Sequence, residues 1–185
     1  MRKLFFLLAL IGVVSISCDG RDRVFKSNSN VLKQKSFSEN ISYIPENYTE
    51  VVTDTILSNG FHIKLKTYTD MEQSVLNEFK QDTINYKEYY REIVSEVTIT
   101  KNSKEIFNDT IDKQFLYKIK NDLQLDNAIV NLMFDQAASM ETNSIVLSAM
   151  IQKTDSKKVS FCNIIIDSEG NYKLEENSTL YAFIN

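Results

Sequence analysis

The sequence contains few of the residues from which proteins build metal centres, cofactor sites and nucleophilic active sites. It has two cysteines and a single histidine, His62, which together cannot form a tetrahedral zinc site. A catalytic triad would depend on the same histidine, and no serine lies in a glycine-flanked elbow. The four glycines form no phosphate-binding loop, and no pair of carboxylates is singled out by its spacing. We therefore expect no bound metal, no cofactor and no catalytic residue, and hence a protein that is not an enzyme.

Clustered positive charge and long apolar runs are also scarce. The formal net charge is −4, and it becomes −6 if Arg2 and Lys3 are removed with an N-terminal signal. Such a chain is unsuited to binding nucleic acid, which requires clustered positive charge. After residue 14 no segment approaches eighteen consecutive apolar residues, so we expect no transmembrane helix there.

The first eighteen residues carry the clearest functional signal. Arg2 and Lys3 form a positive head, residues 4–14 are almost purely apolar, and residues 15–18 read Ser-Ile-Ser-Cys. This layout is typical of a secretory signal, and the apolar run is too short to span a bilayer. Because it ends in Cys18, the segment resembles the lipobox of bacterial lipoproteins, in which the cysteine is acylated and the chain is cut just before it. The alternative is a secreted protein that is cut at a nearby position.

The chain is expected to have three parts. Residues 1–17 are predicted to be the signal peptide, residues 18–44 a flexible tether, and residues 45–185 a single β-rich domain. The tether is rich in polar residues, and about twenty-five such residues have a mean reach of about 25–30 Å. Pro45, the only proline, favours extended backbone at Ile44 and is expected to mark the start of the domain.

The second cysteine, Cys162, would have no disulfide partner if Cys18 is acylated. Residues 159–166 around it are β-branched and apolar, which favours a buried and inert thiol in a strand. A nucleophilic role would need an activating base nearby. The fold is then expected to depend on apolar packing without a disulfide bond.

The clearest turn signal is Asn59-Gly60. Residues 51–57 and 61–69 on either side are rich in strand formers, and Asn-Gly tolerates the positive φ angles of a tight hairpin turn. In the second of these strands apolar and polar residues alternate. This alternation predicts one buried face and one solvent-facing side, which carries His62.

The segment that follows is ambiguous. Tyr86, Tyr89 and Tyr90 have the spacing of a helix face, whereas residues 95–100 alternate as in a strand. The β-branched residues and the polar turn after them favour a strand that begins near Arg91.

The rest of the pattern predicts strands and one helix. Residues 70–85 are expected to form a loop with at most one helical turn. A helix is predicted over residues 113–123, with Asp112 as its N-cap. Strands are predicted over residues 105–111, 128–134, 144–151, 158–166, 172–174 and 180–184. The predicted fold is mainly β (α+β), an antiparallel meander sheet of short strands with one capping helix.

Residues 167–171, Asp-Ser-Glu-Gly-Asn, contain side chains of the kind that bind calcium. The glycine comes too early for a calcium-binding loop, and no closing glutamate follows at the required distance. We interpret the segment as a hairpin turn, while calcium binding by oxygen ligands elsewhere stays open.

Three short segments match a modification motif. Thr55, Thr83 and Thr110 each lie between an aspartate and an isoleucine, which resembles the acceptor for O-glycosylation in Bacteroidota. About one match would be expected by chance from this composition. The alternative is that threonine and isoleucine occur here as strand formers beside polar turns.

Beyond the signal, residues 60–68, 105–108 and 164–172 are similar to segments of a group of small Bacteroidota lipoproteins that carry one domain of unknown function. The resemblance covers about residues 45–185, and its motifs are strands and hairpin turns. It implies an anchored β-rich domain and transfers no active site.

These observations lead to a functional hypothesis. We expect a non-catalytic domain, anchored through lipid at Cys18 to the outer membrane, that binds or scaffolds an envelope protein or a glycan. Its membrane face, periplasmic or surface, stays open. Two alternatives also stay open: a structural or assembly factor of an outer-membrane complex, and a carboxylate-based hydrolase.

Overall fold

The computed structural model describes residues 38–156 and 158–176. The chain divides into two compact units, Met1–Ser38 and Glu39–Asn185. Apart from Ser38, the described residues belong to the second unit. The predicted signal peptide, Cys18 and the strand predicted over residues 180–184 lie outside the described residues.

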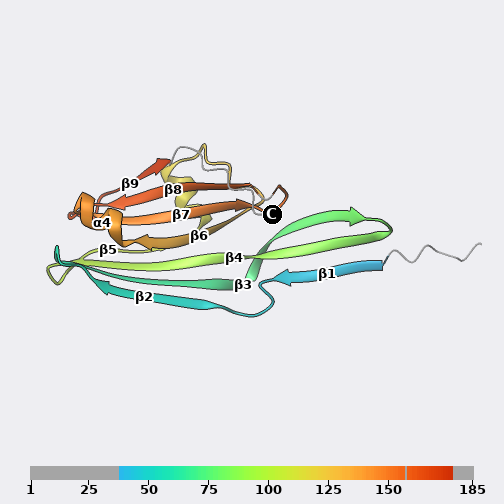
Figure 1. Cartoon of the computed structure of the whole chain (residues 1–185), viewed down its shortest axis with the longest axis horizontal. Helices are drawn as coiled ribbons and strands as arrows, with labels where there is room; N and C mark the ends of the chain where they lie inside the picture. The colour runs from blue at the N-terminus through green and yellow to red at the C-terminus, as the bar shows by residue number, and fades with distance from the viewer. Residues whose placement is uncertain (1–37, 157, 177–185) are drawn as a thin grey trace, which may run out of the picture. The chain divides into compact units, whose positions relative to one another are not determined.

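The first sheet has five strands and is built on the long hairpin of β3 and β4 (Figure 1). Its strands are β1 Ser38–Ile44, β2 Glu50–Ile56, β3 Phe61–Gln81, β4 Ile84–Lys101 and β5 Lys104–Ile111. The order across the sheet is β1-β4-β3-β2, and β5 also pairs with β4. β1 and β5 therefore share the edge of β4 that faces away from β3. In Figure 1, β1 runs in the same direction as β4.

The second sheet has four strands in the order β6-β7-β8-β9. They are β6 Ala128–Asp135, β7 Ile145–Lys153, β8 Val159–Ile166 and β9 Tyr172–Glu176. Two short helices lie in the connections, α3 Lys113–Ile119 before β6 and α4 Gln136–Thr142 between β6 and β7. None of the helices in the described part of the chain is long and apolar enough to cross a membrane.

The prediction of a mainly β fold is confirmed. Strands that follow one another in sequence pair antiparallel from β2 to β5 and from β6 to β9, as in a meander. The strands form two sheets, however, and the described residues contain two helices where one was predicted. The second helix, α4, was missed because its short sequence has no apolar period; it is capped at its start by Asp135, whose side chain accepts a hydrogen bond from the Ala138 amide.

The core lies between the two sheets and follows the alternation along each strand. In β3, Phe61 and Ile63 are fully buried, while His62 between them is partly exposed, as predicted. The second sheet contributes facing residues, of which the most deeply buried are Ala128, Ile145, Leu147, Ala149, Ile164 and Ile166. Burial of one such aliphatic side chain contributes about 1.5–3 kcal/mol, so apolar packing is the main stabilising term.

Residues 70–85 do not form the predicted loop. β3 continues to Gln81, and residues 74–81 pair with residues 84–91 of β4. The chain turns at Asp82 and Thr83, where Asp82 has a positive φ of 55°. The prediction failed because the pairing resumes only after an irregularity between Thr69 and Ser74, which interrupts the sequence pattern.

The end of the predicted tether is also different, because residues 38–44 form strand β1. The ring of Tyr43 stacks on that of Tyr89, with centroids 5.0 Å apart, and the guanidinium of Arg91 lies 4.7 Å from the Tyr43 ring centroid. These contacts come from residues distant in the sequence, so a local pattern could not show them. The prediction for residues 18–37 lies outside the described residues.

Helix α3 begins as predicted and ends early. The Asp112 carboxylate accepts a hydrogen bond from the Phe115 amide at 2.8 Å, which confirms Asp112 as the N-cap. The helix stops at Ile119 instead of residue 123. Phe115 and Leu116 are its buried residues, and they anchor it to the core.

The two glycines of the hairpin turns allow a test of the turn geometry. Gly60 and Gly170 both have positive φ, +86° and +88°. A methyl group on Gly170 would lie 2.1 Å from the backbone carbonyl oxygen of Ile106, whereas one on Gly60 would meet only the side chain of Asn102 at 2.6 Å. The Asn102 side chain can move away, but the backbone of β5 cannot move without disturbing the sheet.

We predict that Gly170→Ala destabilises the protein by about 3 kcal/mol and Gly60→Ala by about 1 kcal/mol. Urea denaturation of the two variants and of the unaltered chain measures both values. Equal losses in the two variants would contradict the packing of the β8–β9 turn against β5.

Candidate functional site

The far half of the β3–β4 hairpin, together with β1, forms a three-stranded projection that we call the arm. It consists of β1, residues 74–81 of β3 and residues 84–91 of β4. Figure 1 shows the arm continuing past the end of the second sheet. From Glu39 on, its side chains are accordingly exposed or half-buried, in contrast with the near half of the same hairpin.

The arm begins at the irregularity in β3. The Asp70 carboxylate accepts hydrogen bonds from the amides of Glu72 and Gln73, at 2.8 and 3.3 Å. The Arg91 guanidinium donates a hydrogen bond to the carbonyl oxygen of Met71 while it lies over the ring of Tyr43. Arg91 therefore links the irregular segment of β3 to β1 and β4, and it fixes where the arm starts.

One face of the arm, here called the Tyr43 face, carries the stacked rings of Tyr43 and Tyr89. Leu76 pairs with Tyr89 across the strands and is 40 % exposed. Towards the end of the arm, Lys87 forms ion pairs with Glu39 at 3.1 Å and with Glu78 at 3.9 Å. The hydrogen bond from Lys87 to Glu39 raises the pKa of the lysine, so its positive charge persists at neutral pH.

The opposite face, here called the Phe79 face, carries a second ring stack. Phe79 and Tyr86 pair across the strands with their rings nearly parallel and centroids 5.0 Å apart. Next to them, the Glu88 carboxylate accepts hydrogen bonds from the Tyr90 hydroxyl at 3.0 Å and the Asn77 amide at 3.3 Å. Burial and then the bond to Glu88 raise the pKa of Tyr90, which remains a neutral donor.

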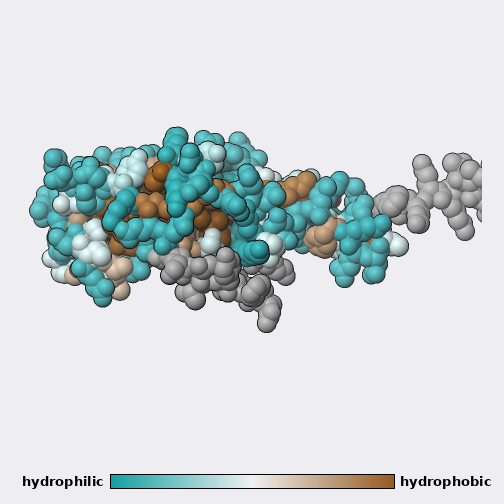
Figure 2. Space-filling view, turned by 90° about the horizontal axis from the view of Figure 1, so that it is seen from above, coloured by the Kyte–Doolittle hydropathy of each residue, from teal (hydrophilic) through white to brown (hydrophobic). Residues whose placement is uncertain are grey.

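The arm leaves large apolar side chains in solvent. Those at least 38 % exposed are Ile41, Tyr43, Ile44, Leu76 and Phe79. Figure 2 shows hydrophobic surface on the arm, and separately a larger area on the part of the domain that contains the second sheet. Exposed apolar residues grouped on one projecting element are typical of a protein–protein contact surface.

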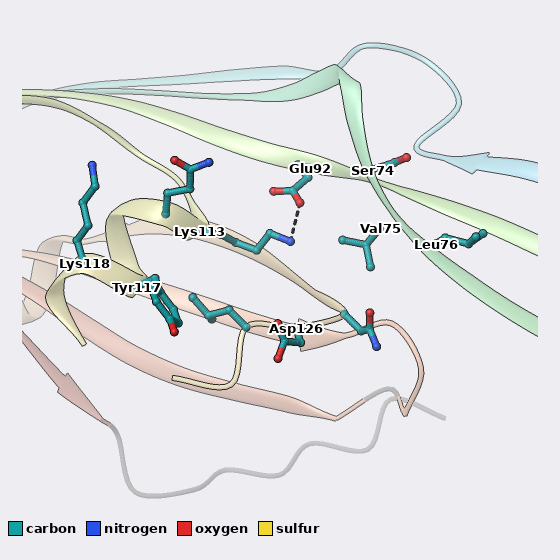
Figure 3. Close-up of a pocket in the computed structure, with 11 residues that line it drawn as sticks. Ser74, Val75, Leu76, Glu92, Lys113, Tyr117, Lys118 and Asp126 are labelled. Carbon is teal, nitrogen blue, oxygen red and sulfur yellow. Dashed lines mark ion pairs between the residues drawn. The ribbon is translucent and has the colours of Figure 1, made fainter. Parts of the chain in front are cut away.

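A groove of about 760 Å³ lies where the base of the arm meets α3 (Figure 3). Its walls are Val75 and Leu76 of β3, Glu92 of β4, residues of α3 that include Tyr117, and residues 125–127 before β6. In Figure 3 the Lys113 amine and the Glu92 carboxylate point toward each other across one wall. Both side chains are about four-fifths buried, so this ion pair is a largely buried part of the groove's lining.

The groove offers limited chemistry. Glu92 forms an ion pair with Lys113, and the other lining carboxylate, Asp126, lies in the loop before β6. A hydrolase of the two-carboxylate type needs one acid and one base or nucleophile that are both available to the substrate. In this structure Glu92 is paired with Lys113 instead of being free to act as such an acid or base.

His62 and Cys162 lie where the sequence predicted them. His62 is on the solvent-facing side of β3, and its Nε2 lies 2.6 Å from an oxygen of Asp54 on β2. Cys162 is buried in β8, 1 % exposed, and burial raises the pKa of its thiol to about 11. A neutral buried thiol is a poor nucleophile at neutral pH.

Residues 167–171 form the turn of the β8–β9 hairpin, as predicted. The Asp167 carboxylate accepts hydrogen bonds from the side-chain amide of Asn171 at 3.0 Å and from the backbone amides of Glu169 and Asn171 at 2.8 and 3.0 Å. These bonds, that from the Asn171 side chain first, lower the pKa of Asp167. Within residues 38–156 and 158–176, no group of three or more histidine, cysteine, aspartate or glutamate side chains is placed to hold a metal ion.

The three threonines of the modification motif have different surroundings. Thr83 is exposed in the turn at the end of the arm, and Thr110 is exposed in β5, while Thr55 is half-buried in β2. O-glycosylation at these residues stays a prediction. Cys18 lies outside the described residues, so acylation there also stays a prediction.

The arm was missed at the sequence level. Tyr86 and Tyr90 lie on the Phe79 face, whereas Tyr89 lies on the Tyr43 face. Neither face of this part of β4 is covered by another layer, so aromatic residues occur on both faces. Their combined spacing along the sequence then resembles that of a helix face. The signal that could have found the turn is Asp82, a residue type that tolerates positive φ better than most.

No family model matches this chain, and no curated protein matches it either.

We predict that Cys162 does not react with a thiol reagent in the folded protein at pH 8, because its thiol is buried and neutral there. In the Cys18→Ser chain, the reagent should modify no thiol without denaturant and one thiol per chain in urea. Fast modification of the folded Cys18→Ser chain would contradict the inert role.

Proposed function

We propose that this protein is a lipid-anchored, non-catalytic envelope protein that binds a membrane-associated partner protein through the arm. Lipidation of Cys18 and location at the outer membrane are the sequence-based parts of this proposal. The observation that carries the binding role is the arm itself, with two stacked ring pairs and exposed apolar residues on a projecting three-stranded sheet.

The connection of the tether favours a partner at the membrane. β1 begins at the end of the arm that carries the β3–β4 turn, where Glu39 contacts Lys87 (Figure 1). Residues 18–37 would then join an acylated Cys18 to this end of the arm. A polar segment of that length has a mean reach of about 25 Å. Because β1 belongs to the arm, the arm is the part of the domain that follows the anchor most directly along the chain.

The residue types on the arm fit protein recognition. Tyrosine and arginine are enriched in the residues that dominate binding energy at protein interfaces, and Tyr43, Tyr89 and Arg91 form one contiguous cluster. Their mutual contacts fix the rings before any partner binds, which lowers the entropy cost of association. Charged residues at the end of the arm, Lys87 and Glu39 among them, would form the polar rim.

A glycan ligand is the second candidate. Sugar rings stack on exposed aromatic faces, and the arm has such rings. In both pairs, however, one face of each ring is occupied by the other ring, which leaves less aromatic surface for a sugar. This observation favours a protein partner.

We predict that the double variant Tyr43→Ala/Tyr89→Ala recovers at least about tenfold less partner than the unaltered chain. The measurement is crosslinking in native membranes, followed by affinity recovery and quantitative mass spectrometry. Tyr117→Ala is the matched control, because Tyr117 is 55 % exposed and lines the groove instead of the arm.

Two outcomes would count against the arm. If Tyr117→Ala reduces recovery and the double variant does not, the groove is the binding site. If no protein is recovered and purified glycans bind the unaltered chain, the glycan candidate replaces the protein partner. Circular dichroism of both variants checks that the loss of rings has not unfolded the domain.

The anchor has a separate test. We predict that Cys18→Ser releases the protein from membranes, because the acyl chains on Cys18 are the means of attachment in this proposal. Sedimentation of membranes after a high-salt wash measures the bound fraction. Retention of the variant in the washed membranes would contradict acylation as the means of attachment.

A further inference from the structure

The outer edge of β2 is an unprotected sheet edge. Within the described residues β2 ends the first sheet, and it pairs with β3 from Glu50 to Ile56 without a bulge. Its sequence, Glu-Val-Val-Thr-Asp-Thr-Ile, contains no lysine and no proline, two residue types that discourage an edge strand from pairing with another chain. Three of its apolar side chains are exposed: Val51 by 66 %, Val52 by 51 % and Ile56 by 76 %.

The contrast with β9, an edge strand of the second sheet, supports this interpretation. β9 carries charged residues at three of its five positions, Lys173, Glu175 and Glu176. Charged side chains on an edge discourage pairing with another chain. β2 has two acidic residues, and each already has a basic neighbour on β3: Asp54 contacts His62, and Glu50 lies 3.2 Å from Lys66.

The hydrogen bonds at the two ends of β2 show which of its backbone groups face the open edge. The Thr69 amide donates to the Thr49 carbonyl at 3.0 Å, and the Leu57 amide donates to the Phe61 carbonyl at 2.7 Å. With the uninterrupted register between them, odd-numbered residues of β2 bond to β3. The antiparallel alternation then directs the amides and carbonyls of four residues outward: Glu50, Val52, Asp54 and Ile56.

We infer that β2 pairs with β2 of a second copy of this chain, antiparallel, around a two-fold axis at Thr53. This arrangement sets Val52 opposite Asp54 of the second copy and Glu50 opposite its Ile56. All outward-facing backbone groups of the four residues find partners. On the other face, Thr53 meets Thr53 and Val51 meets Thr55, which are favourable pairs of β-branched residues.

The acidic residues select this register over its neighbours. Side chains alternate between the two faces of a strand, so the first sheets of the two copies keep their core faces on the same side only if the two-fold axis passes through a residue of β2. Other registers are therefore reached by moving the axis one whole residue at a time. An axis at Val52 would place Glu50 directly opposite Asp54, and an axis at Asp54 would place the two Asp54 side chains opposite each other. Like charges directly opposite destabilise a strand pair. The axis at Thr53 opposes no acidic residues directly.

Cysteine crosslinking in native membranes tests the register. Residues that oppose each other in a pair without mutual hydrogen bonds have Cα atoms about 4.5 Å apart, which a disulfide bond can span. Thr53→Cys should therefore form a disulfide-linked dimer on mild oxidation. Thr55→Cys is the matched control. Residue 55 lies on the same face of the strand, but it opposes Val51 of the second copy and is therefore four residues away from residue 55 of that copy. Absence of a dimer from Thr53→Cys, or equal dimer from both variants, would overturn the inference.

Opposite charges at one position give a second, independent test. Val52→Asp would place an acid opposite Asp54 of the second copy, whereas Val52→Lys would place a base there. Sedimentation equilibrium of the full chain in detergent should give a dimer dissociation constant at least about tenfold lower for Val52→Lys than for Val52→Asp. Equal dissociation constants for the two variants, or an unaltered chain that is monomeric at every concentration, would overturn the inference. Neither result depends on the partner of the arm.

Discussion

The pairing of β3 with β4 is the interaction on which the rest of the structure depends. In its near half, buried residues of both strands, among them Ile63 and Ile99, form one wall of the core. In its far half the same two strands continue without the second sheet and become the arm. The core thus stabilises the hairpin at one end, and the hairpin carries the proposed binding surface at the other.

The arm would be a weak structure if it were only a two-stranded ribbon, since an isolated hairpin is at best marginally stable in water. β1 adds a third strand, and Arg91 connects that strand to the irregular segment of β3. The ring stacks on the two faces supply apolar contact where no second layer exists. The same rings that hold the arm together are those that a partner would meet.

The described domain contains no disulfide bond, and its sheets are joined by packing. At one end Phe107 of β5, Phe115 of α3 and Tyr172 of β9 form a cluster of three rings, with centroid distances of 5.3–6.3 Å. The nearby β8–β9 turn approaches β5 so closely that Gly170 has no room for a side chain. These contacts join the first sheet to the last strand of the second.

How well the sequence predicted the structure depended on whether each feature is local. The Asn59-Gly60 turn, the Asp112 cap and the burial of Cys162 follow from short patterns, and the structure confirms them. The arm could not be predicted, because β1 pairs with a strand more than forty residues away and because an uncovered strand loses the two-residue alternation. The lipid anchor at Cys18 stays a prediction, since that residue lies outside the described part of the chain.

Amide hydrogen exchange of the full chain, without partner, tests whether the arm is preformed. If β1, β3 and β4 hold it as a sheet, peptides that cover residues 84–91 should exchange at least about tenfold more slowly than an unstructured chain, and Tyr43→Ala should speed them more than it speeds residues 95–99. Exchange of residues 84–91 at the unstructured rate in the unaltered chain would show that the arm is not a fixed surface, and the proposed mode of recognition would fail.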